Sequence, residues 1–396
     1  MDAIKKILII SAVFPPEPVV SAVLSKDIAS ELSKTDDVVV VCPKPTRPLG
    51  FKFGNNEKID VKVTVIDSYT CPQYSILGRL RESYSFGRKC AWHIKQHHTQ
   101  IKAIYTNAWP LFSQYWIAKY ARKYHIPCII HIQDIYPESY TNKLPLFLKK
   151  VANSLLLPID SYILNKADKI IVISEKMKDY LCNNRKFSYD KIEVVYNWQD
   201  EQEFINFSNK NYQNEHDCFT FMYLGNIGPL AGLELVIDAF SELNTNNCRL
   251  IIAGSGSMVE QLKQRTSMQS NIHFWDVPQG EVPKIQSSAD VMILPVKKGG
   301  AMTSIPSKLP AYMFSAKPVL ACVDIDSDTA HTVKSSGCGW VIEPENITLL
   351  KIQIQTIISI SEKKLHDMGN MGYQYALSLF SKKKNLPKIL KIIQDL

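Results

Sequence analysis

Short and almost wholly apolar runs recur along this chain, and they constrain its fold more than any other feature. Typical examples are Lys6–Ser11 (KILIIS) and Cys128–Ile132 (CIIHI), each followed by polar or turn-forming residues. Runs without polar alternation predict strands that are buried on both faces, as in parallel sheets. Segments of helical character lie between them, so repeated strand–helix units predict parallel, doubly wound α/β sheets.

The strand–helix pattern stops once and then restarts, which predicts two domains. Residues 197–217 are polar and lack periodicity, and we interpret them as a linker. A chain of 396 residues suits two domains. We therefore expect a Rossmann-like domain over 1–200, a second over 201–382, and a last helix, 383–396, that packs back on the first domain. The expected strands are Lys6–Ser11, Asp37–Cys42, Val61–Ile66, Ala103–Tyr105, Cys128–Ile132, Lys169–Ile173, Glu193–Tyr196, Phe219–Leu224, Arg249–Ala253, Ile272–Trp275, Val291–Leu294, Val319–Cys322 and Gly339–Ile342.

Bulk composition narrows the class of protein. No run of about 18 apolar residues occurs, so we expect no transmembrane helix. The apolar run near the N-terminus is short and leads into Pro15-Pro16, which indicates a first strand and not a signal peptide. The nine cysteines include no C-x-x-C pair. That pattern favours a reducing, cytoplasmic environment over a disulfide framework or a zinc site.

Positive charge is concentrated in the first half of the chain. Residues 1–200 carry 28 basic and 19 acidic side chains, a net charge of +9, whereas residues 201–396 carry 18 and 19, a net charge of −1. A basic half suggests an anionic partner, which is a nucleic acid, a membrane surface or a phosphorylated substrate. No nucleic-acid recognition module is present, so we expect no nucleic-acid partner. A simple surplus of surface lysines is the alternative.

Three loops of the second half carry glycines where strands are expected to end. In doubly wound sheets ligands bind at the carboxyl ends of the strands, and glycines let a backbone approach a ligand closely. Together the loops predict a site for a nucleotide diphosphate. The candidate residues are Gly225, Asn226 and Gly228 in the first loop, Gly254 and Gly256 in the second, and Lys298 in the third.

The stretch Thr303–Lys317 adds a helix start with a cation. Pro306 and Pro310 are four residues apart, and proline is tolerated only in the first helical turn, so the helix starts near Ser307. Ser307 is a candidate N-cap and Lys308 lies in the first turn, where free N–H groups and an ammonium favour an anion. Thr303 and Ser304 precede them as further candidate donor-binding residues. The alternative is an ordinary strand–helix junction with a solvated lysine.

In their order and spacing these segments resemble the retaining GT-B glycosyltransferases of glycosyltransferase family 4. The resemblance implies two Rossmann-like domains facing each other across a cleft, the first binding the acceptor and the second the donor. It implies transfer of a sugar from a nucleotide sugar, a UDP-linked hexosamine or deoxyhexosamine, with retention and without a metal or other cofactor. The motifs that carry it are FPPEPVVSA (14–22), HIQDIYPES (131–139), KADKIIVIS (166–174), VVYNWQD (194–200), YLGNIG (223–228), IIAGSGS (251–257), ADVMILP (289–295) and SIPSKLPAYMFSAKPVL (304–320).

The same resemblance implies an acceptor saccharide carried on undecaprenyl diphosphate, in capsule or O-antigen assembly. Residues 76–102 interleave basic and aromatic side chains, and Leu144–Leu157 is strongly apolar with Lys149 and Lys150. Such segments can lie on an anionic membrane, so we expect a cytoplasmic protein held peripherally on the inner face of the plasma membrane. A helix packed on the sheet with a solvated basic face would show the same pattern.

Several positions depart from the family pattern. Two glutamates eight positions apart are usual where this chain has Thr303 and Ala311, and a phosphate-binding Arg and Lys are usual near Asn226 and Ala231. The second glutamate normally holds ribose hydroxyls. We interpret Lys308 as the residue that compensates for the missing cations.

Candidate catalytic residues follow the fifth expected strand. The resemblance places Gln133 where many relatives have a histidine, and Asp134 could position the acceptor hydroxyl or act as a base. Asp134 is equally able to cap the next turn. Glu138 and the loop residues Val19, Val20 and Ser21 complete the expected acceptor and phosphate region, while His131 fits the core better than catalysis.

Three alternatives remain open at this stage. A GT-B-like sugar-nucleotide epimerase shares the two-domain plan but needs carboxylates to abstract a proton, and the acid-poor cleft disfavours it. A non-catalytic nucleotide-sugar-binding subunit would bind a donor without turnover. A metal-dependent GT-A transferase is suggested by the string 324–328 (DIDSD), which fits a surface loop better.

Overall fold

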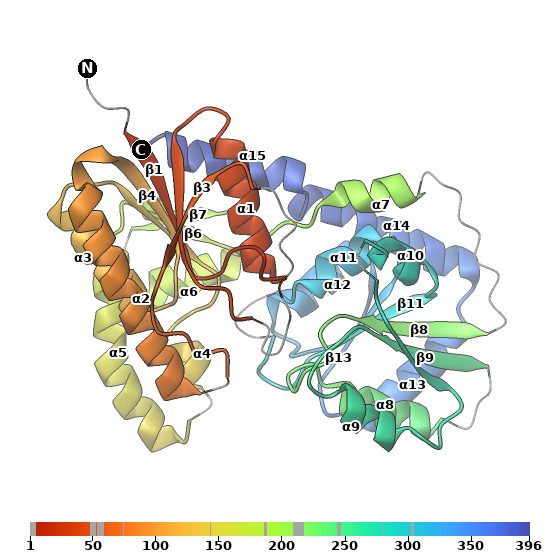
Figure 1. Cartoon of the computed structure of the whole chain (residues 1–396). Coiled ribbons are helices and arrows are strands. Elements are labelled where there is room, and N and C mark those ends of the chain that lie inside the picture. The colour runs from red at the N-terminus through yellow and green to blue at the C-terminus, as the bar shows by residue number, and fades with distance from the viewer. Residues whose placement is uncertain are drawn as a thin grey trace. The chain divides into compact units, whose positions relative to one another are not determined.

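The structure, a computed structural model, describes residues 5–47, 53, 59–73, 75–142, 144–185, 188–208, 218–243, 247–278, 280–301 and 305–396. It divides into two compact units. The N-terminal unit comprises Met1–Asn197 and Asn385–Leu396, and the C-terminal unit comprises Trp198–Lys384. Each unit is a parallel sheet with helices on both of its faces (Figure 1).

The N-terminal unit is built on seven parallel strands in the order β3-β2-β1-β4-β5-β6-β7. The central strand β1 pairs with β2 on one side and β4 on the other, and Ile9 faces both Val40 and Tyr105. The chain reverses direction across the sheet between β1 and β4, the point at which doubly wound sheets bind ligands. The strands are β1 Lys6–Ser11, β2 Val38–Pro43, β3 Lys62–Ile66, β4 Ile101–Asn107, β5 Cys128–Ile132, β6 Lys169–Val172 and β7 Ile192–Val194.

Helices cover both faces of this sheet because the crossovers between parallel strands must return the chain to the starting edge. On one face α2, α3 and α5 lie in a layer, since Gly87 of α2 packs on Ser113 of α3, and the ring of Tyr115 of α3 contacts that of Tyr162 of α5. The helices are α1 Val20–Leu32, α2 Ile76–His97, α3 Phe112–Lys123, α4 Glu138–Thr141, α5 Leu146–Lys166 and α6 Glu175–Arg185.

The C-terminal unit repeats the plan with six parallel strands in the order β10-β9-β8-β11-β12-β13. Its strands are β8 Phe219–Leu224, β9 Cys248–Ala253, β10 Ile272–Trp275, β11 Val291–Pro295, β12 Val319–Cys322 and β13 Gly339–Ile342. Its helices are α7 Glu201–Ser208, α8 Leu233–Ser241, α9 Val259–Arg265, α10 Val282–Ser287, α11 Lys308–Phe314, α12 Asp328–Ser336, α13 Ile347–Ile358 and α14 Glu362–Leu379. The last helix, α15 (Lys382–Gln394), leads the chain into the N-terminal unit.

All thirteen expected strands are present, with ends that differ by two residues at most. The apolar runs succeed as predictors because both faces of each central strand are buried. The linker prediction is wrong over Glu201–Ser208, which forms α7. This helix is polar apart from a few residues, and Phe204 is its buried anchor against Phe314. Residues 209–217 of the expected linker lie outside the described residues.

Two further observations bear on the class of protein. All nine cysteines are free thiols, and most are buried within the two cores. No helix in the described part of the chain combines the length and the apolar character that crossing a bilayer requires.

Candidate functional site

The first two glycine loops of the C-terminal unit pack directly on each other. The Ile227 N–H donates to the Ser255 carbonyl at 2.8 Å, and the Met258 N–H donates to the Ile227 carbonyl at 3.1 Å. A Cβ atom on Gly254, whose φ is +128°, would lie 2.1 Å from the carbonyl oxygen of Gly225. At Gly256 it would lie 2.1 Å from the carbonyl oxygen of Ile227. These glycines therefore let two backbones meet, which is a structural demand separate from the close approach of a ligand.

The remaining residues of the first loop are exposed or small. Tyr223 fixes the loop from below, since its hydroxyl donates to the Asn226 carbonyl at 2.5 Å. The Asn226 side chain is exposed, and its amide lies beside Gly228. The loop therefore presents backbone and an amide, with no charged side chain between Gly225 and Gly232.

Lys308 lies against this loop from the neighbouring strand–helix junction. A Cβ atom on Gly225 would fall 2.1 Å from Lys308 Cε, and Lys308 Nζ lies 5.4 Å from the centre of the Tyr223 ring. Burial lowers the pKa of Lys308. Across the described ranges, Lys308 makes no ion pair, so its charge is partly desolvated without a carboxylate to balance it. A partly buried cation in this state favours an anionic ligand.

The helix that carries Lys308 is anchored to the same strand. The Tyr312 hydroxyl donates to the Leu224 carbonyl at 2.8 Å and accepts from the Leu224 N–H at 3.0 Å. Helix α11 begins at Lys308 with Ser307 at the N-cap position, as expected. The expected side-chain cap is absent, because Ser307 has helical backbone angles (φ −59°, ψ −15°) from which its hydroxyl makes no cap bond.

The third glycine loop has a structural partner of its own. The Gly299 N–H donates to both carboxylate oxygens of Asp324 at 2.9 Å. Asp324 therefore holds the third glycine loop against the loop that follows β12. In the latter loop Ser327 caps α12, since its hydroxyl accepts from the Ala330 N–H at 3.1 Å. Lys298 is exposed beside Gly299. Thr303 and Ser304, the other expected donor residues, lie outside the described residues.

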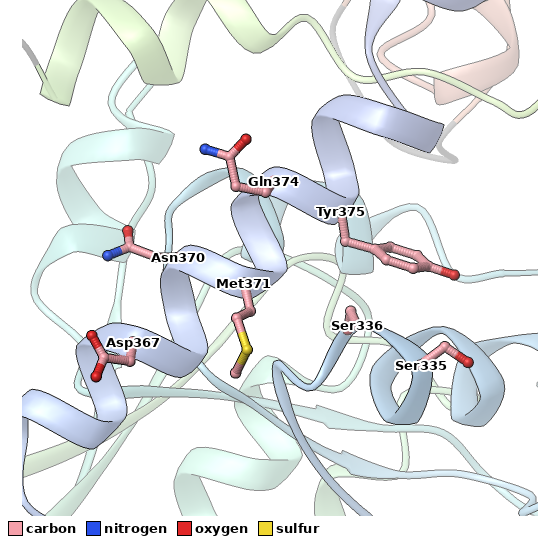
Figure 2. Close-up of a pocket in the computed structure, with 7 residues that line it drawn as sticks. All are labelled: Ser335, Ser336, Asp367, Asn370, Met371, Gln374 and Tyr375. Carbon is pink, nitrogen blue, oxygen red and sulfur yellow. The ribbon is translucent and has the colours of Figure 1, made fainter.

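A broad depression of about 660 Å³ lies elsewhere on the C-terminal unit, between α12 and α14 (Figure 2). Ser335 and Ser336 line it from the end of α12, just before β13 begins, so it lies near the amino end of that strand. The glycine loops follow the carboxyl ends of β8 and β9. The depression is therefore on the opposite edge of the sheet from the glycine loops and Lys308.

In the N-terminal unit a cavity of about 120 Å³ opens where β1, β4 and β5 end. It brings together three of the expected residues, Ser21, Gln133 and Asp134. Val19 precedes α1 as its N-cap residue, Val20 is the first residue of the helix, and neither of them lines the cavity. Ser21 therefore lies inside the first turn of α1, which starts one residue before it at Val20. The full lining is Ala12, Val13, Ser21, Asn107, Ala108, Trp109, Pro110, Gln114, His131, Ile132, Gln133, Asp134 and Tyr136.

His131 is part of the core, as expected, and it is also one of the residues that line this cavity. Its Nδ1 lies 2.6 Å from the Tyr105 hydroxyl, and burial lowers the pKa of His131 to about 3. The imidazole is therefore neutral at physiological pH. Gln133 is fixed on its other side by Asn197, whose amide donates to Gln133 Oε1 at 3.0 Å.

Sequence reasoning missed Asn107 and Trp109 as residues of this cavity. They follow β4 in the run Thr106–Pro110, and their position after a central strand was the signal that could have identified them. The Arg47 guanidinium lies 4.3 Å from the centre of the Trp109 ring. Arg47 also pairs with the buried Glu82 at 2.6 Å.

Glu138, which the sequence predicts in the same acceptor region as Asp134, is not among the residues that line the cavity. Both of its carboxylate oxygens accept from Arg185 Nη2 at 2.8 Å, and Tyr180 donates to Oε1 at 2.9 Å. Arg185 is buried and also binds Asp160 at 2.7 Å. Glu138 therefore belongs to an ion-pair network that joins α4, α5 and α6.

Known proteins resemble the chain over almost its full length. Residues 22–203 match the family model Glycosyltransferase Family 4, and residues 204–375 match Glycosyl transferases group 1. The probable glycosyltransferase WbjE of Pseudomonas aeruginosa is 22% identical over 299 residues, which cover 74% of this chain and 73% of WbjE.

Solved structures share the fold at low sequence identity. HepE of Anabaena, crystallised with UDP, superposes with a TM-score of 0.71 at 16% identity, covering 99% of this chain and all of HepE. WaaG, a glycosyltransferase involved in lipopolysaccharide biosynthesis, gives a TM-score of 0.68 at 14% identity, covering 98% of this chain and 99% of WaaG. The two parallel-sheet units and the two consecutive family matches agree. The chain therefore belongs to the GT-B glycosyltransferases, with a family 4 domain followed by a group 1 domain.

Proposed function

We propose that this glycosyltransferase moves a sugar from a UDP-linked hexosamine or deoxyhexosamine onto a saccharide carried by a lipid diphosphate, with retention at the anomeric carbon. The observation that carries the donor half is Lys308, a partly buried ammonium without an acidic partner in the described residues, held against the Gly225 loop. A nucleoside diphosphate supplies the missing negative charge. HepE, which shares the fold, was crystallised with UDP and with UDP-glucose.

In this proposal Lys308 acts on the leaving group. When the bond to the anomeric carbon breaks, negative charge accumulates on the diphosphate, and a preorganised cation stabilises that charge. The acceptor hydroxyl attacks the face from which the diphosphate leaves, and a departing phosphate oxygen takes its proton. Asp134 positions the acceptor hydroxyl or assists as a base from the cavity of the N-terminal unit.

The departures from the family pattern fit a donor site with fewer charges. Asn226 and Ala231 stand where relatives carry cations, and Thr303 and Ala311 stand where relatives carry glutamates. We infer that Lys308 supplies the charge that the first loop lacks and that no metal is needed. Ribose is then held by groups other than a glutamate at position 311.

Exposed apolar side chains support a membrane-bound acceptor. Leu77 of α2 is 79% exposed, and Leu146 and Phe147 of α5 are 78% and 76% exposed. Both helices extend past α3 at the edge where the strands end. A helix rises by about 1.5 Å per residue. Leu77 therefore lies about 15 Å along α2 from Gly87, which contacts α3, and Phe147 lies about 22 Å along α5 from Tyr162, which also contacts α3.

Basic residues accompany these apolar ends. Lys149 and Lys150 lie next to Phe147 on α5, and the exposed Arg81 follows Leu77 on α2. Apolar tips among basic side chains suit the surface of an anionic bilayer, on the inner face of the plasma membrane. WaaG acts in lipopolysaccharide biosynthesis, and this likeness supports a place in capsule or O-antigen assembly.

The direct test is a thermal-shift screen of UDP- and GDP-sugars with the full chain, followed by linkage analysis of the product. We expect one UDP-sugar to raise the Tm and to be transferred with retention in the presence of EDTA. Saturable binding without turnover on any lipid-linked acceptor would identify a non-catalytic subunit. Conversion of the nucleotide sugar without an acceptor would identify an epimerase.

A further inference from the structure

One guanidinium connects the loop between β5 and α4 to the surrounding helices. Arg185, the last residue of α6, is buried, and its Nη2 donates to the Tyr136 carbonyl at 3.0 Å and to both carboxylate oxygens of Glu138 at 2.8 Å. Its Nε donates to Asp160 Oδ2 of α5 at 2.7 Å. This one side chain of α6 therefore bonds to the loop, to α4 and to α5 at the same time.

The loop that Arg185 binds carries Asp134. It comprises residues 133–137, between the end of β5 at Ile132 and the start of α4. Ile132 is held by strand pairing in the sheet, and Tyr136 is held by Arg185. Asp134 lies midway between these two fixed points, and both Asp134 and Tyr136 line the cavity of the N-terminal unit. The position of the Asp134 carboxylate therefore depends on the bond from Arg185.

Burial gives this network a defined geometry more than it adds stability. The side chains of Arg185, Asp160 and Glu138 are 2%, 8% and 12% exposed. The cost of removing such charges from water offsets much of their attraction, so a buried ion network contributes little net stability. A planar guanidinium with directed N–H groups does fix the geometry of the groups that it binds. The bond to the Tyr136 carbonyl extends this fixed geometry to the loop backbone, which an ion pair between helices does not require.

We propose that Arg185, oriented by Asp160, is a positioning residue for sugar transfer, because it fixes the loop that carries Asp134. The inference rests on the proposed function, in which Asp134 positions the acceptor hydroxyl or assists as a base. Arg185 is not among the residues that line the cavity. It acts through the loop backbone at Tyr136 and through Glu138 at the start of α4.

The first test measures the loop directly and needs no activity. Arg185→Lys keeps the positive charge but replaces two donor nitrogens by one ammonium, which cannot serve α5 and the loop together. The Ser139 N–H donates to the Ile135 carbonyl, and the Tyr140 N–H donates to the Pro137 carbonyl. Hydrogen exchange at these two amides, followed by mass spectrometry of the full chain, therefore reports on the loop. We expect exchange at least about tenfold faster in the variant, the effect of losing one hydrogen bond to a charged group.

Arg249→Lys is the matched control for that substitution. Arg249 of β9 is half-buried in the C-terminal unit, and its Nε donates to Thr220 Oγ1 at 2.9 Å. The control should leave exchange in the segment 139–142 as it is in wild type. If exchange in this segment is no faster in Arg185→Lys than in the control, Arg185 does not hold the loop and the inference is wrong.

The second test asks whether the loop matters for transfer. With the UDP-sugar from the screen and its acceptor, Arg185→Lys should lower kcat by about ten- to a hundredfold, the effect of a small misplacement of a reacting group. The Kd for UDP, which we place in the C-terminal unit, should change less than about twofold. A loss of UDP affinity in step with kcat would show a general structural role and overturn the inference, as would a wild-type kcat in the folded variant.

The third test uses an isosteric change and also serves if Arg185→Lys does not fold. Burial raises the pKa of Asp160 to about 6, against the charge of Arg185, while Glu138 raises it further. Asp160→Asn therefore resembles the protonated form of Asp160 at every pH. The ratio of wild-type kcat to that of the variant should be about fivefold at pH 7.5, because a bond to a charged acceptor is roughly twice as strong as one to a neutral acceptor. It should approach one at pH 5.

A ratio of kcat values that does not change with pH would mean that the charge of Asp160 does not orient Arg185, and the inference would fail. The exchange measurement keeps this inference separate from the proposed function. If the wild-type chain binds UDP but transfers no sugar, the proposed function fails, while exchange in the segment 139–142 still decides whether Arg185 holds the loop.

Discussion

The two units place chemically different surfaces at equivalent edges of similar parallel sheets. In the C-terminal unit the carboxyl ends of β8 and β9 carry interlocked glycine loops and one partly buried cation, Lys308. In the N-terminal unit the ends of β1, β4 and β5 enclose neutral side-chain donors and a carboxylate. One architecture therefore presents backbone groups and one cation at this edge of the C-terminal unit, and uncharged side-chain donors with a carboxylate at the equivalent edge of the N-terminal unit.

This difference predicts how each edge tolerates mutation. Where loops pack backbone on backbone, adding a single carbon atom changes the path of the chain. Where side chains point into a cavity, an isosteric change alters one hydrogen bond and leaves the sheet intact. Substitutions in the C-terminal loops should therefore affect folding, whereas those in the N-terminal cavity should affect binding.

The largest effect is expected from Gly254→Ala. The new Cβ would lie 2.1 Å from the Gly225 carbonyl oxygen on a residue with φ +128°. Strain and overlap should lower the free energy of unfolding by at least about 4 kcal/mol. Urea denaturation followed by fluorescence measures this loss.

Gly225→Ala is the matched control for that prediction. Gly225 also has a positive φ, +156°, but its new Cβ meets the flexible end of Lys308 instead of backbone. The variant should fold with a loss of about 1–2 kcal/mol and should displace the Lys308 ammonium. Equal destabilisation by the two substitutions would show that loop packing does not govern this edge.

The next effect concerns Lys308 itself. Lys308→Ala removes the cation that we propose for the leaving diphosphate. The transition-state stabilisation that is measured through kcat/KM should therefore fall by about 2–4 kcal/mol. Lys263→Ala, an exposed lysine of α9, controls for loss of a positive charge. Steady-state transfer measured with the UDP-sugar from the screen decides the matter. Near wild-type kcat/KM in Lys308→Ala would disprove the compensation hypothesis.

The fold was predictable because its signals are local. Strands such as β5 and β12 are buried over their whole length, so their apolar runs identify them without alignment or structure. Helix α7 escaped notice because tertiary packing of Phe204 on Phe314 stabilises a segment whose own sequence is polar. Local sequence carries no record of such a distant contact.

The sites were less predictable, for a related reason. The sequence placed Asp134 and Glu138 together as neighbours in one loop, but Arg185, 47 residues later, binds Glu138. It read the glycines at 254 and 256 as contacts for a ligand, whereas the other loop lies where their Cβ atoms would be. Asn107 and Trp109 line the same cavity as Gln133 because β4 and β5 pair side by side, and this pairing has to be known before the residues can be assigned to one site.

A smaller effect comes from pH and from His131. The pKa of His131 falls from 6.5 in the unfolded chain to about 3 in the folded chain, because burial disfavours the charged imidazolium form. Below pH 6.5 the unfolded chain binds a proton that the folded chain does not, so stability falls as pH falls. Between pH 7.5 and pH 5 the loss should be about 2 kcal/mol, from about 1.4 kcal/mol per pH unit.

Urea denaturation at the two pH values, compared with His131→Gln, isolates this contribution. The variant is less stable at pH 7.5 because the Tyr105 contact changes, but its stability should depend less on pH. An equally steep dependence in both proteins would place the titrating group elsewhere.

The smallest effect is expected at the exposed apolar ends of α2 and α5, for which we propose an electrostatic contact with an anionic membrane. Lys150 is an exposed residue of α5 next to the apolar residues Leu146 and Phe147. Lys150→Gln should weaken binding to vesicles that contain anionic lipid by about 1 kcal/mol, or about fivefold, at low salt. Lys363→Gln in α14 removes an equally exposed charge from the C-terminal unit and should have no effect. The difference should shrink as salt rises, because the Debye length falls to about 8 Å at 0.15 M. Equal loss from both lysines would mean that overall charge, and not the N-terminal unit, directs the protein to the membrane.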